Sequence, residues 1–271
     1  MRVVDLDKGK PPRTTVLSYG TMRAGKTRWA ASFPRPLFLA DATESGWTTI
    51  EGMQPEDFYE LGRKPEVWAI EKAADMMQAV TQIEADLRAT AGKWRSVVVD
   101  SLTFYSDTFY NALYSGAVAG GRSPDLRQIY GQLANHLRDL RVRLHSLPLN
   151  VVWLCLEKSP GEENPFGGPM IPGQSAQKFA AGVDYLLYHR CFQPNPQVGP
   201  QWEIRSRQFG AYKAGGRDGG LLPDPLTDCT YKSFAEALGL PAPLQAAGNG
   251  QQQVVVPQRR IVTPGRTLPA R

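Results

Sequence analysis

The chain has 271 residues, and 42% of them are hydrophobic, so it can bury a substantial core and is not a disordered protein. Its longest apolar run, residues 151–156, is too short to span a bilayer, and its N-terminus shows no apolar signal segment. Three widely spaced cysteines and three histidines indicate neither a disulfide framework nor a zinc site. We therefore expect a folded protein of the cytoplasm.

The net charge of +5 is unevenly distributed along the chain. Residues 242–271 contain no Asp or Glu but four arginines, namely Arg259, Arg260, Arg266 and Arg271. From residue 241 the chain is also rich in Pro, Gln and Gly, a composition that cannot bury enough apolar surface to order itself. We expect a polar lead-in over residues 1–13, one core domain over 14–240 and a disordered basic tail over 241–271.

Strands and helices are predicted to alternate along the core. β-branched or continuous apolar stretches predict strands at residues 14–19, 36–41, 67–70, 96–100, 149–156, 185–190 and 202–207. Apolar residues recurring at helical spacing, with their boundary signals, predict helices at residues 26–33, 72–91, 102–119, 126–144, 175–181 and 230–240. This alternation predicts an α/β fold with a mostly parallel sheet, helices on both faces and a C-terminal β-hairpin region.

Three stretches between these elements are predicted to be irregular. Residues 42–65 and 158–174 are rich in Pro or Gly and lack periodicity, and residues 210–217 form a basic, glycine-rich turn. A loop as long as residues 158–174 is usually functional or disordered. The helix predicted at 126–144 carries Arg127, Arg138, Arg141 and Arg143 on one face, which is either a solvated surface or a nucleic-acid surface.

The first strand leads directly into a phosphate-binding motif of the form glycine, four residues, then Gly-Lys-Thr. The motif consists of Gly20, Thr21, Met22, Arg23, Ala24, Gly25, Lys26 and Thr27. Such a loop turns its backbone N–H groups inward around a polyphosphate, and the helix that follows adds its positive end. Lys26 would reach the β- and γ-phosphates, and the Thr27 hydroxyl would hold Mg²⁺. A glycine-rich surface turn is the alternative, and the order strand, loop, helix argues against it.

A second acidic position is predicted at the end of the strand at 96–100. Ligands bind at the carboxyl edge of open α/β sheets, so Asp100 is placed to hold Mg²⁺ opposite Thr27. Asp100 could instead cap the helix that begins at Leu102. Because Asp100 is followed by Ser101 and not by a glutamate, the base must come from another strand if the chain hydrolyses ATP. Glu44, just beyond the strand at 36–41, is the best-placed candidate.

The sequence resembles the phage-encoded RecA-like ATPases that are grouped with single-strand annealing proteins and recombinases. The resemblance covers about residues 14–240. Besides the phosphate loop it rests on residues 34–37, 41–44, 97–103, 147–152, Glu157, 172–174, 183–188 and 213–217.

The resemblance implies a RecA-like P-loop core that binds ATP and Mg²⁺ and handles single-stranded DNA. It implies assembly into a head-to-tail homo-oligomer, with a single-strand binding protein as a further partner, in a phage-infected or prophage-carrying bacterium. By position, Glu44 would orient the attacking water and Glu157 would sense the γ-phosphate. Lys213 and Arg217 would reach the ATP of the neighbouring subunit, although Lys213 could equally be the tip of an ordinary basic turn.

Two other functions remain open on the sequence. The chain could be a nucleotide-binding assembly or loading factor that hydrolyses little ATP. It could also be a nucleotide kinase, but such kinases need an arginine-bearing lid, and residues 158–174 contain no arginine.

Overall fold

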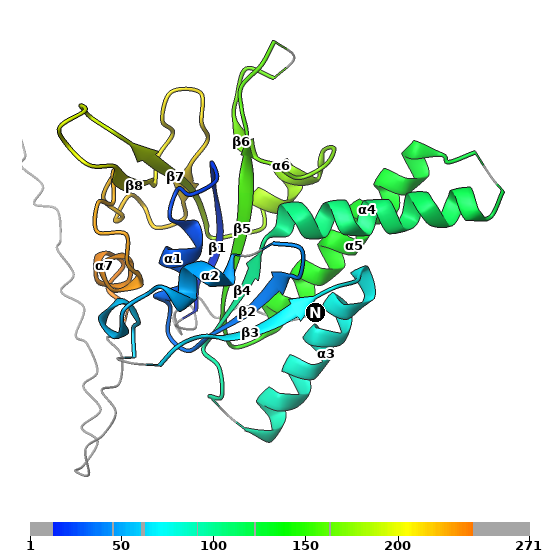
Figure 1. Cartoon of the computed structure of the whole chain (residues 1–271), viewed down its shortest axis with the longest axis horizontal. Coiled ribbons are helices and arrows are strands. Elements are labelled where there is room, and N and C mark those ends of the chain that lie inside the picture. Colours follow the sequence, from blue (N-terminus) through cyan, green and yellow to red (C-terminus); the bar gives the residue numbers. More distant parts are fainter. Residues whose placement is uncertain are drawn as a thin grey trace, which may run out of the picture.

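The structure is a computed structural model that describes residues 13–240 except 45, 61, 62, 91, 122 and 163 (Figure 1). The predicted basic tail and all but the last residue of the predicted lead-in lie outside the described residues. No helix within the described part of the chain has the length and hydrophobicity that crossing a bilayer requires.

A single twisted sheet forms the centre of the domain (Figure 1). Its strand order is β3-β2-β4-β5-β1-β7-β8, and every neighbouring pair is parallel except β7 and β8. Two short strands pair antiparallel to it, β6 with β5 and β9 with β7. The bounds are β1 Thr15–Gly20, β2 Pro36–Asp41, β3 Glu66–Ile70, β4 Ser96–Asp100, β5 Asn150–Lys158, β6 Gly168–Pro169, β7 Tyr185–Phe192, β8 Gln201–Arg205 and β9 Gly215–Gly216.

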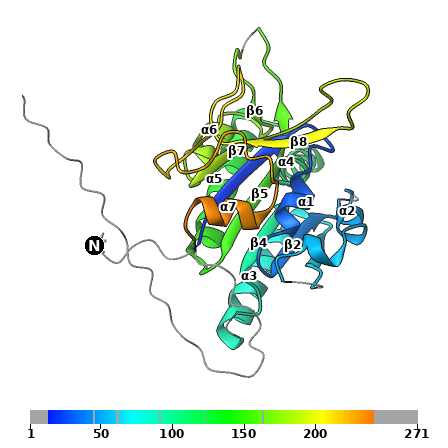
Figure 2. The ribbon, with the colours of Figure 1, turned by 90° about the vertical axis from the view of Figure 1, so that its left-hand side faces the viewer.

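Helices cover both faces of this sheet and create two separate hydrophobic cores. In one core, α3, α4, α5 and α6 pack against strand residues that face one side of the sheet, such as Leu17 and Tyr19. In the other core, α1, α2 and α7 pack against strand residues that face the opposite side, such as Val16. Figure 2 views the ribbon from the side on which α7 lies. The bounds are α1 Lys26–Ala31, α2 Trp47–Glu51, α3 Ala73–Ala89, α4 Leu102–Ala119, α5 Leu126–Ser146, α6 Ser175–Ala180 and α7 Tyr231–Ala237.

The predicted α/β architecture is confirmed, and so is the C-terminal hairpin formed by β7 and β8. The central strands are buried on both faces, which is why they read in the sequence as unbroken apolar runs. The sheet therefore brings the carboxyl ends of β1, β2, β4 and β5 to one edge, where Gly20, Asp41, Asp100 and the end of β5 lie.

All three stretches predicted to be irregular contain regular structure, and residues 210–217 include the short strand β9. Residues 42–65 include α2 and a short 3-10 helix at Pro55–Asp57. Residues 158–174 include β6, because β5 continues past Leu156 to Lys158 and the chain folds back to pair with it. The hairpin of β5 and β6 projects beyond the rest of the sheet (Figure 1). These elements are too short to show periodicity, and tertiary contacts decide them.

The arginines of α5 are largely engaged in contacts within the domain. Arg143 forms an ion pair of 2.8 Å with Glu84 of α3, and Arg141 donates hydrogen bonds to the backbone oxygens of Lys178 and Phe179. Arg138 pairs with the neighbouring Asp139 at 3.2 Å. Two of the four arginines therefore hold this helix against α3 and α6, and a role of the helix in nucleic-acid binding stays a prediction.

Candidate nucleotide-binding site

The phosphate loop connects the last residue of β1, Gly20, to the first residue of α1, Lys26. Arg23 and Gly25 adopt positive φ angles of 62° and 83°, which give the loop its tight curvature. Gly20 has no room for a side chain, since a Cβ there would lie 2.3 Å from the backbone oxygen of His189 in β7. Both glycines of the motif are therefore required by the shape of the loop.

Lys26 is buried and lies across the phosphate loop. Its Nζ donates hydrogen bonds of 2.9 Å to the backbone oxygen of Gly20 and 2.6 Å to that of Thr21. Burial lowers the pKa of this ammonium group, and the nearby carboxylates, Asp100 foremost, oppose that shift. A polyphosphate would supply Lys26 with stronger, charge-assisted partners than these two carbonyl oxygens.

Thr27 and Asp100 lie opposite each other, as the motif predicts. The Thr27 hydroxyl donates a hydrogen bond of 2.9 Å to Oδ2 of Asp100. The residue that caps α4 is Ser101, whose hydroxyl accepts a hydrogen bond from the backbone N–H of Phe104, so the alternative role of Asp100 as the cap is wrong. Burial raises the pKa of Asp100, while the hydrogen bond from Thr27 and the charge of Lys26 lower it.

Glu44 follows β2 and lies beside Asp100. Burial, reinforced by the charge of Asp100, raises the pKa of the Glu44 carboxyl to about 7, and hydrogen bonds from Ser101 oppose the rise. Its Oε2 is buried and has no hydrogen-bond partner among the described residues. In Asp41, by contrast, Oδ1 already accepts hydrogen bonds from the backbone N–H and the hydroxyl of Thr43. Unlike Asp41, Glu44 therefore keeps a buried acceptor atom without a partner next to Asp100.

Glu157 lies in β5, one residue beyond the pairing of Leu156 with Gly20 of the phosphate loop. Its Oε1 accepts a hydrogen bond of 3.3 Å from the Tyr212 hydroxyl, and its Oε2 is buried without a partner in the part of the chain that the structure describes. Tyr212 in turn stacks on Tyr188, with ring centroids 4.3 Å apart. Glu157 is thus coupled to the glycine-rich turn at residues 210–217, a connection that the sequence did not reveal.

Lys213 and Arg217 lie away from this chain's own phosphate loop. The Nζ of Lys213 lies 4.8 Å from the ring centroid of Phe166, and its backbone oxygen accepts a hydrogen bond of 2.6 Å from the Tyr19 hydroxyl. Arg217 donates a hydrogen bond of 2.5 Å to the backbone oxygen of Ala181. Both side chains are exposed, so their predicted action on a neighbouring subunit's nucleotide stays a prediction.

Two residues important to the site were missed in the sequence. His189 is buried beneath the loop, where its Nε2 lies 2.5 Å from the Ser18 hydroxyl and its ring hydrogen-bonds the Ala24 backbone. Burial lowers the pKa of His189 to about 3, so it stays neutral. Trp202 of β8 lies against the other side of the loop, and its Nε1 donates to the backbone oxygen of Arg23 at 3.4 Å. Neither belongs to a motif, and only the pairing of distant strands brings them here.

The residues at this edge fit a nucleotide with a bound Mg²⁺. The glycines of the loop leave room for phosphates to approach its backbone closely. The buried Oε2 of Glu44 has no hydrogen-bond donor among the described residues and could accept one from a water or ligand. No cluster of three or more His, Cys, Asp or Glu side chains in the described residues could hold a metal alone. Mg²⁺ commonly takes only one or two protein oxygens and completes its shell with water and phosphate, and the Thr27 hydroxyl and the Asp100 carboxylate are two such oxygen ligands.

The fold and this loop together define the chain as a P-loop nucleotide-binding domain. More narrowly, residues 13–209 match a family of AAA domains (AAA_24), and the chain belongs to that family. No curated protein matches the sequence significantly. Among solved structures, the KaiC-like protein PH0186 from the hyperthermophilic archaeon Pyrococcus horikoshii OT3 is similar, with 16% identity and a TM-score of 0.43 over 71% of this chain and 77% of that one. That similarity is too weak to indicate a function.

Proposed function

We propose that this protein binds ATP with Mg²⁺, hydrolyses it, and uses the cycle to act on single-stranded DNA during phage recombination or replication. The observation that carries the ATPase part is the position of Glu44. Its unpartnered, buried Oε2 lies beside Asp100, which is hydrogen-bonded to Thr27 of the phosphate loop. Burial and repulsion by Asp100 both disfavour the charged form of Glu44. A site that only bound nucleotide would not need a second carboxylate in so unfavourable a position.

Different residues of the chain have different roles in the proposed hydrolysis. Lys26 and the loop backbone hold the phosphates, and Thr27 and Asp100 would hold the metal, which when bound neutralises charge on the phosphate oxygens. Glu44 accepts a hydrogen bond from the attacking water and orients it. Because its pKa is raised to about 7, Glu44 can also take the proton of that water near neutral pH.

The β5–β6 hairpin supports an interaction with single-stranded DNA. Phe166 and Met170 are exposed on it, at 41% and 46% of their surface, and Lys213 lies over the Phe166 ring. Lys213 is held there because the backbone of its turn pairs with Gly167 of the hairpin. An exposed aromatic ring beside cations suits stacked bases and their phosphates. Residues 158–174 contain one Lys and two Glu, so they carry little positive charge for phosphate contacts, and the turn at 210–217 adds Lys213 and Arg217.

The alternative of a nucleotide kinase gains no support. Residues 158–174, which would have to form an arginine-bearing lid, contain no arginine, and part of them is paired to β5 as β6. The alternative of a nucleotide-dependent assembly factor differs from the proposal only in turnover, so the same experiment decides between them.

The test is the ATPase rate of the full chain with and without single-stranded DNA, together with a Lys26→Ala variant. We expect single-stranded DNA to stimulate turnover and Lys26→Ala to abolish it while the circular dichroism spectrum is retained. Tight ATP binding with little turnover, unaltered by DNA, would identify an assembly factor. Unchanged turnover in a folded Lys26→Ala variant would overturn the nucleotide site itself.

The source of DNA affinity is tested by truncating the chain after Leu240. The tail carries four arginines and no acidic residue, so its loss should weaken binding and flatten the dependence of log K on log salt concentration. Each lost phosphate contact should reduce that slope by about 0.7 for a single strand. Phe166→Ala in the full chain should weaken binding without changing the slope, since stacking involves no counterions. If neither the truncation nor Phe166→Ala changes the affinity for single-stranded DNA, neither the tail nor the Phe166 ring contributes to binding.

Assembly is tested by mixing inactive variants. If Lys213 acts on the nucleotide of a neighbouring subunit, mixtures of Lys213→Ala and Glu44→Gln protomers should recover ATPase activity at the interfaces that combine two intact partners. Mixtures that stay inactive at concentrations where oligomers form would exclude a site shared between subunits.

A further inference from the structure

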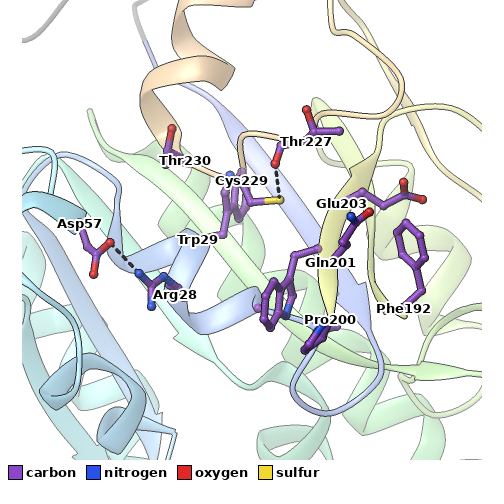
Figure 3. Close-up of a pocket in the computed structure, with 13 residues that line it drawn as sticks. Arg28, Trp29, Asp57, Phe192, Pro200, Gln201, Glu203, Thr227, Cys229 and Thr230 are labelled. Carbon is purple, nitrogen blue, oxygen red and sulfur yellow. Dashed lines mark hydrogen bonds and ion pairs between the residues drawn. The ribbon is translucent and has the colours of Figure 1, made fainter. Parts of the chain in front are cut away.

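A cavity of about 800 Å³ opens directly beside the phosphate loop (Figure 3). Ala24 and Gly25 of the loop form part of its wall. The rest is contributed by α1, by Asp57 of the 3-10 helix, by the β7–β8 hairpin and by the segment that leads into α7. Arg28, Phe192, Trp202 and Thr230 are among the lining residues. The cavity therefore adjoins the phosphate loop at Ala24 and Gly25.

Trp202 is the aromatic wall nearest the loop. A Cβ built on Gly25 would lie 3.2 Å from Cδ1 of Trp202, so the indole lies against the backbone of the loop. The hydrogen bond from its Nε1 to the backbone oxygen of Arg23 fixes the ring in this position. Even so, 46% of Trp202 is exposed. A large ring that is anchored at its edge and open on much of its surface is suited to stacking against a planar ligand.

Arg28 stands on α1, in the first turn after the loop, and faces the same cavity (Figure 3). Its guanidinium forms an ion pair of 2.7 Å with Asp57. Asp57 is itself held in place by a hydrogen bond of 2.9 Å from the backbone N–H of Gln54. The side of the cavity formed by α1 therefore carries a positioned planar cation, which also suits an aromatic ligand.

Several of the polar side chains around the cavity are already engaged, although Gln201 and Thr227 also line it. Glu203 forms ion pairs with Arg190 and Arg205, at 2.8 Å and 3.4 Å. The Thr230 hydroxyl accepts a hydrogen bond from the backbone N–H of Ser233, and the Cys229 thiol lies 3.7 Å from the backbone oxygens of Leu226 and Thr227. These groups are poorly placed to read the hydrogen-bonding edge of a base, because doing so would break an existing contact.

We propose that this cavity is the base subsite of the nucleotide, where a purine stacks on Trp202 and is recognised by its aromatic face more than by its edge. The inference rests on the proposed function, since the phosphates of the same nucleotide must occupy the loop. It adds that adenine and guanine nucleotides bind with similar affinity and that pyrimidine nucleotides, with a smaller ring, bind more weakly. Stacking is tolerant of base identity because every base has a π-face.

The test compares nucleotides with inorganic tripolyphosphate, which carries the phosphates but no base. Calorimetric titration with Mg²⁺ present should give ATP and GTP affinities within about fivefold of each other, with UTP weaker. Trp202→Ala should weaken ATP and GTP by about tenfold and leave tripolyphosphate unchanged. Trp202→Phe, which keeps a ring but loses the bond to Arg23, should retain most of the ATP affinity. Tyr114→Ala, which removes a ring that is 41% exposed on α4, is the control and should change nothing.

The outcomes separate this inference from the proposed function. Equal weakening of ATP and tripolyphosphate by Trp202→Ala would show that Trp202 acts on the shape of the loop, and would overturn the base subsite alone. An unchanged ATP affinity in Trp202→Ala, or a strong preference of the wild type for ATP over GTP, would do the same. Failure of the wild type to bind either ATP or tripolyphosphate would overturn the proposed function and this inference with it.

Discussion

The Thr27 hydroxyl donates a hydrogen bond of 2.9 Å to Oδ2 of Asp100, although the two residues are 73 positions apart in the chain. The bond joins the phosphate loop after β1 to the end of β4, across the intervening strand β5. It brings a hydroxyl and a carboxylate, both ligands that Mg²⁺ accepts, to the same point at the edge of the sheet. The backbone of Gly46 closes this point from the side of β2, since a Cβ there would lie 3.2 Å from the same oxygen.

Asp100→Asn should abolish most of the dependence of nucleotide affinity on Mg²⁺. The amide keeps the shape and can still accept the hydrogen bond from Thr27, but it lacks the charge that attracts the metal. We expect the ratio of ATP affinities with Mg²⁺ and with EDTA to fall by at least about tenfold, as measured by calorimetry. Asp139→Asn, an exposed carboxylate on α5, is the matched control. A ratio equal to that of the wild type would show that Asp100 does not bind the metal.

Glu44→Gln should separate ATP binding from hydrolysis. Turnover should fall by about 10²–10⁴-fold because the amide cannot take a proton, whereas the ATP affinity should be retained. In the wild type, kcat/KM should rise with pH up to about 7, where the carboxyl becomes ionised, and this limb should vanish in the variant. Full activity of Glu44→Gln would exclude Glu44 as the base and make Asp41 the next candidate.

His189→Gln should reduce the sensitivity of the fold to acid. In the native protein burial keeps His189 neutral, with a pKa of about 3, whereas in the unfolded chain it takes up a proton below about 6.5. The unfolded state thus binds more protons between these values, and the free energy of unfolding falls as the pH drops below 6.5. Between about pH 7.5 and pH 5 the wild type should lose about 2 kcal/mol more than the variant.

Urea unfolding at the two pH values measures this difference. Part of the acid sensitivity should survive in His189→Gln, because burial also lowers the pKa of His145 to about 4. At the higher pH the variant should be less stable than the wild type, because it has lost the packing and hydrogen bonds of the buried imidazole. At the lower pH this loss is partly compensated, because the variant no longer has a histidine that must stay neutral in the native state. An identical pH dependence in the two proteins would show that the pKa of His189 is not lowered in the native state.

Gly20→Ala should destabilise the fold, whereas Gly116→Ala should not. A methyl group on Gly20 would lie 2.3 Å from the backbone oxygen of His189, and neither strand can move without breaking the pairing of β1 with β7. We expect a loss of about 2 kcal/mol or more in the free energy of unfolding. Gly116 lies in α4 with nothing within 4 Å of its Cβ position, so alanine there should stabilise by about 0.5–1 kcal/mol. Equal stability of the two variants would contradict the close contact.

The fold class, the phosphate loop and the carboxylate that faces it could all be predicted from the residues alone. These features are local: a buried strand is a run of apolar residues, a phosphate loop is a fixed spacing of glycines, and Asp100 simply ends such a run. Since parallel strands place their carboxyl ends at one edge, the approach of Asp100 to Thr27 follows from the strand pattern. The same reasoning placed Glu44 beside them, where burial and the charge of Asp100 raise its pKa.

The residues that surround that edge are brought there by long-range contacts. The pairing of β7 with β1 brings His189 to Ser18, the β7–β8 hairpin brings Trp202 to Gly25, and the turn at 210–217 brings Tyr212 to Glu157 and Lys213 to Phe166. None of these contacts has a sequence signature. Each depends on which strands pair and in which register, and the burial of the whole sheet between its two layers of helices selects that arrangement, because no short segment buries enough surface to select it alone.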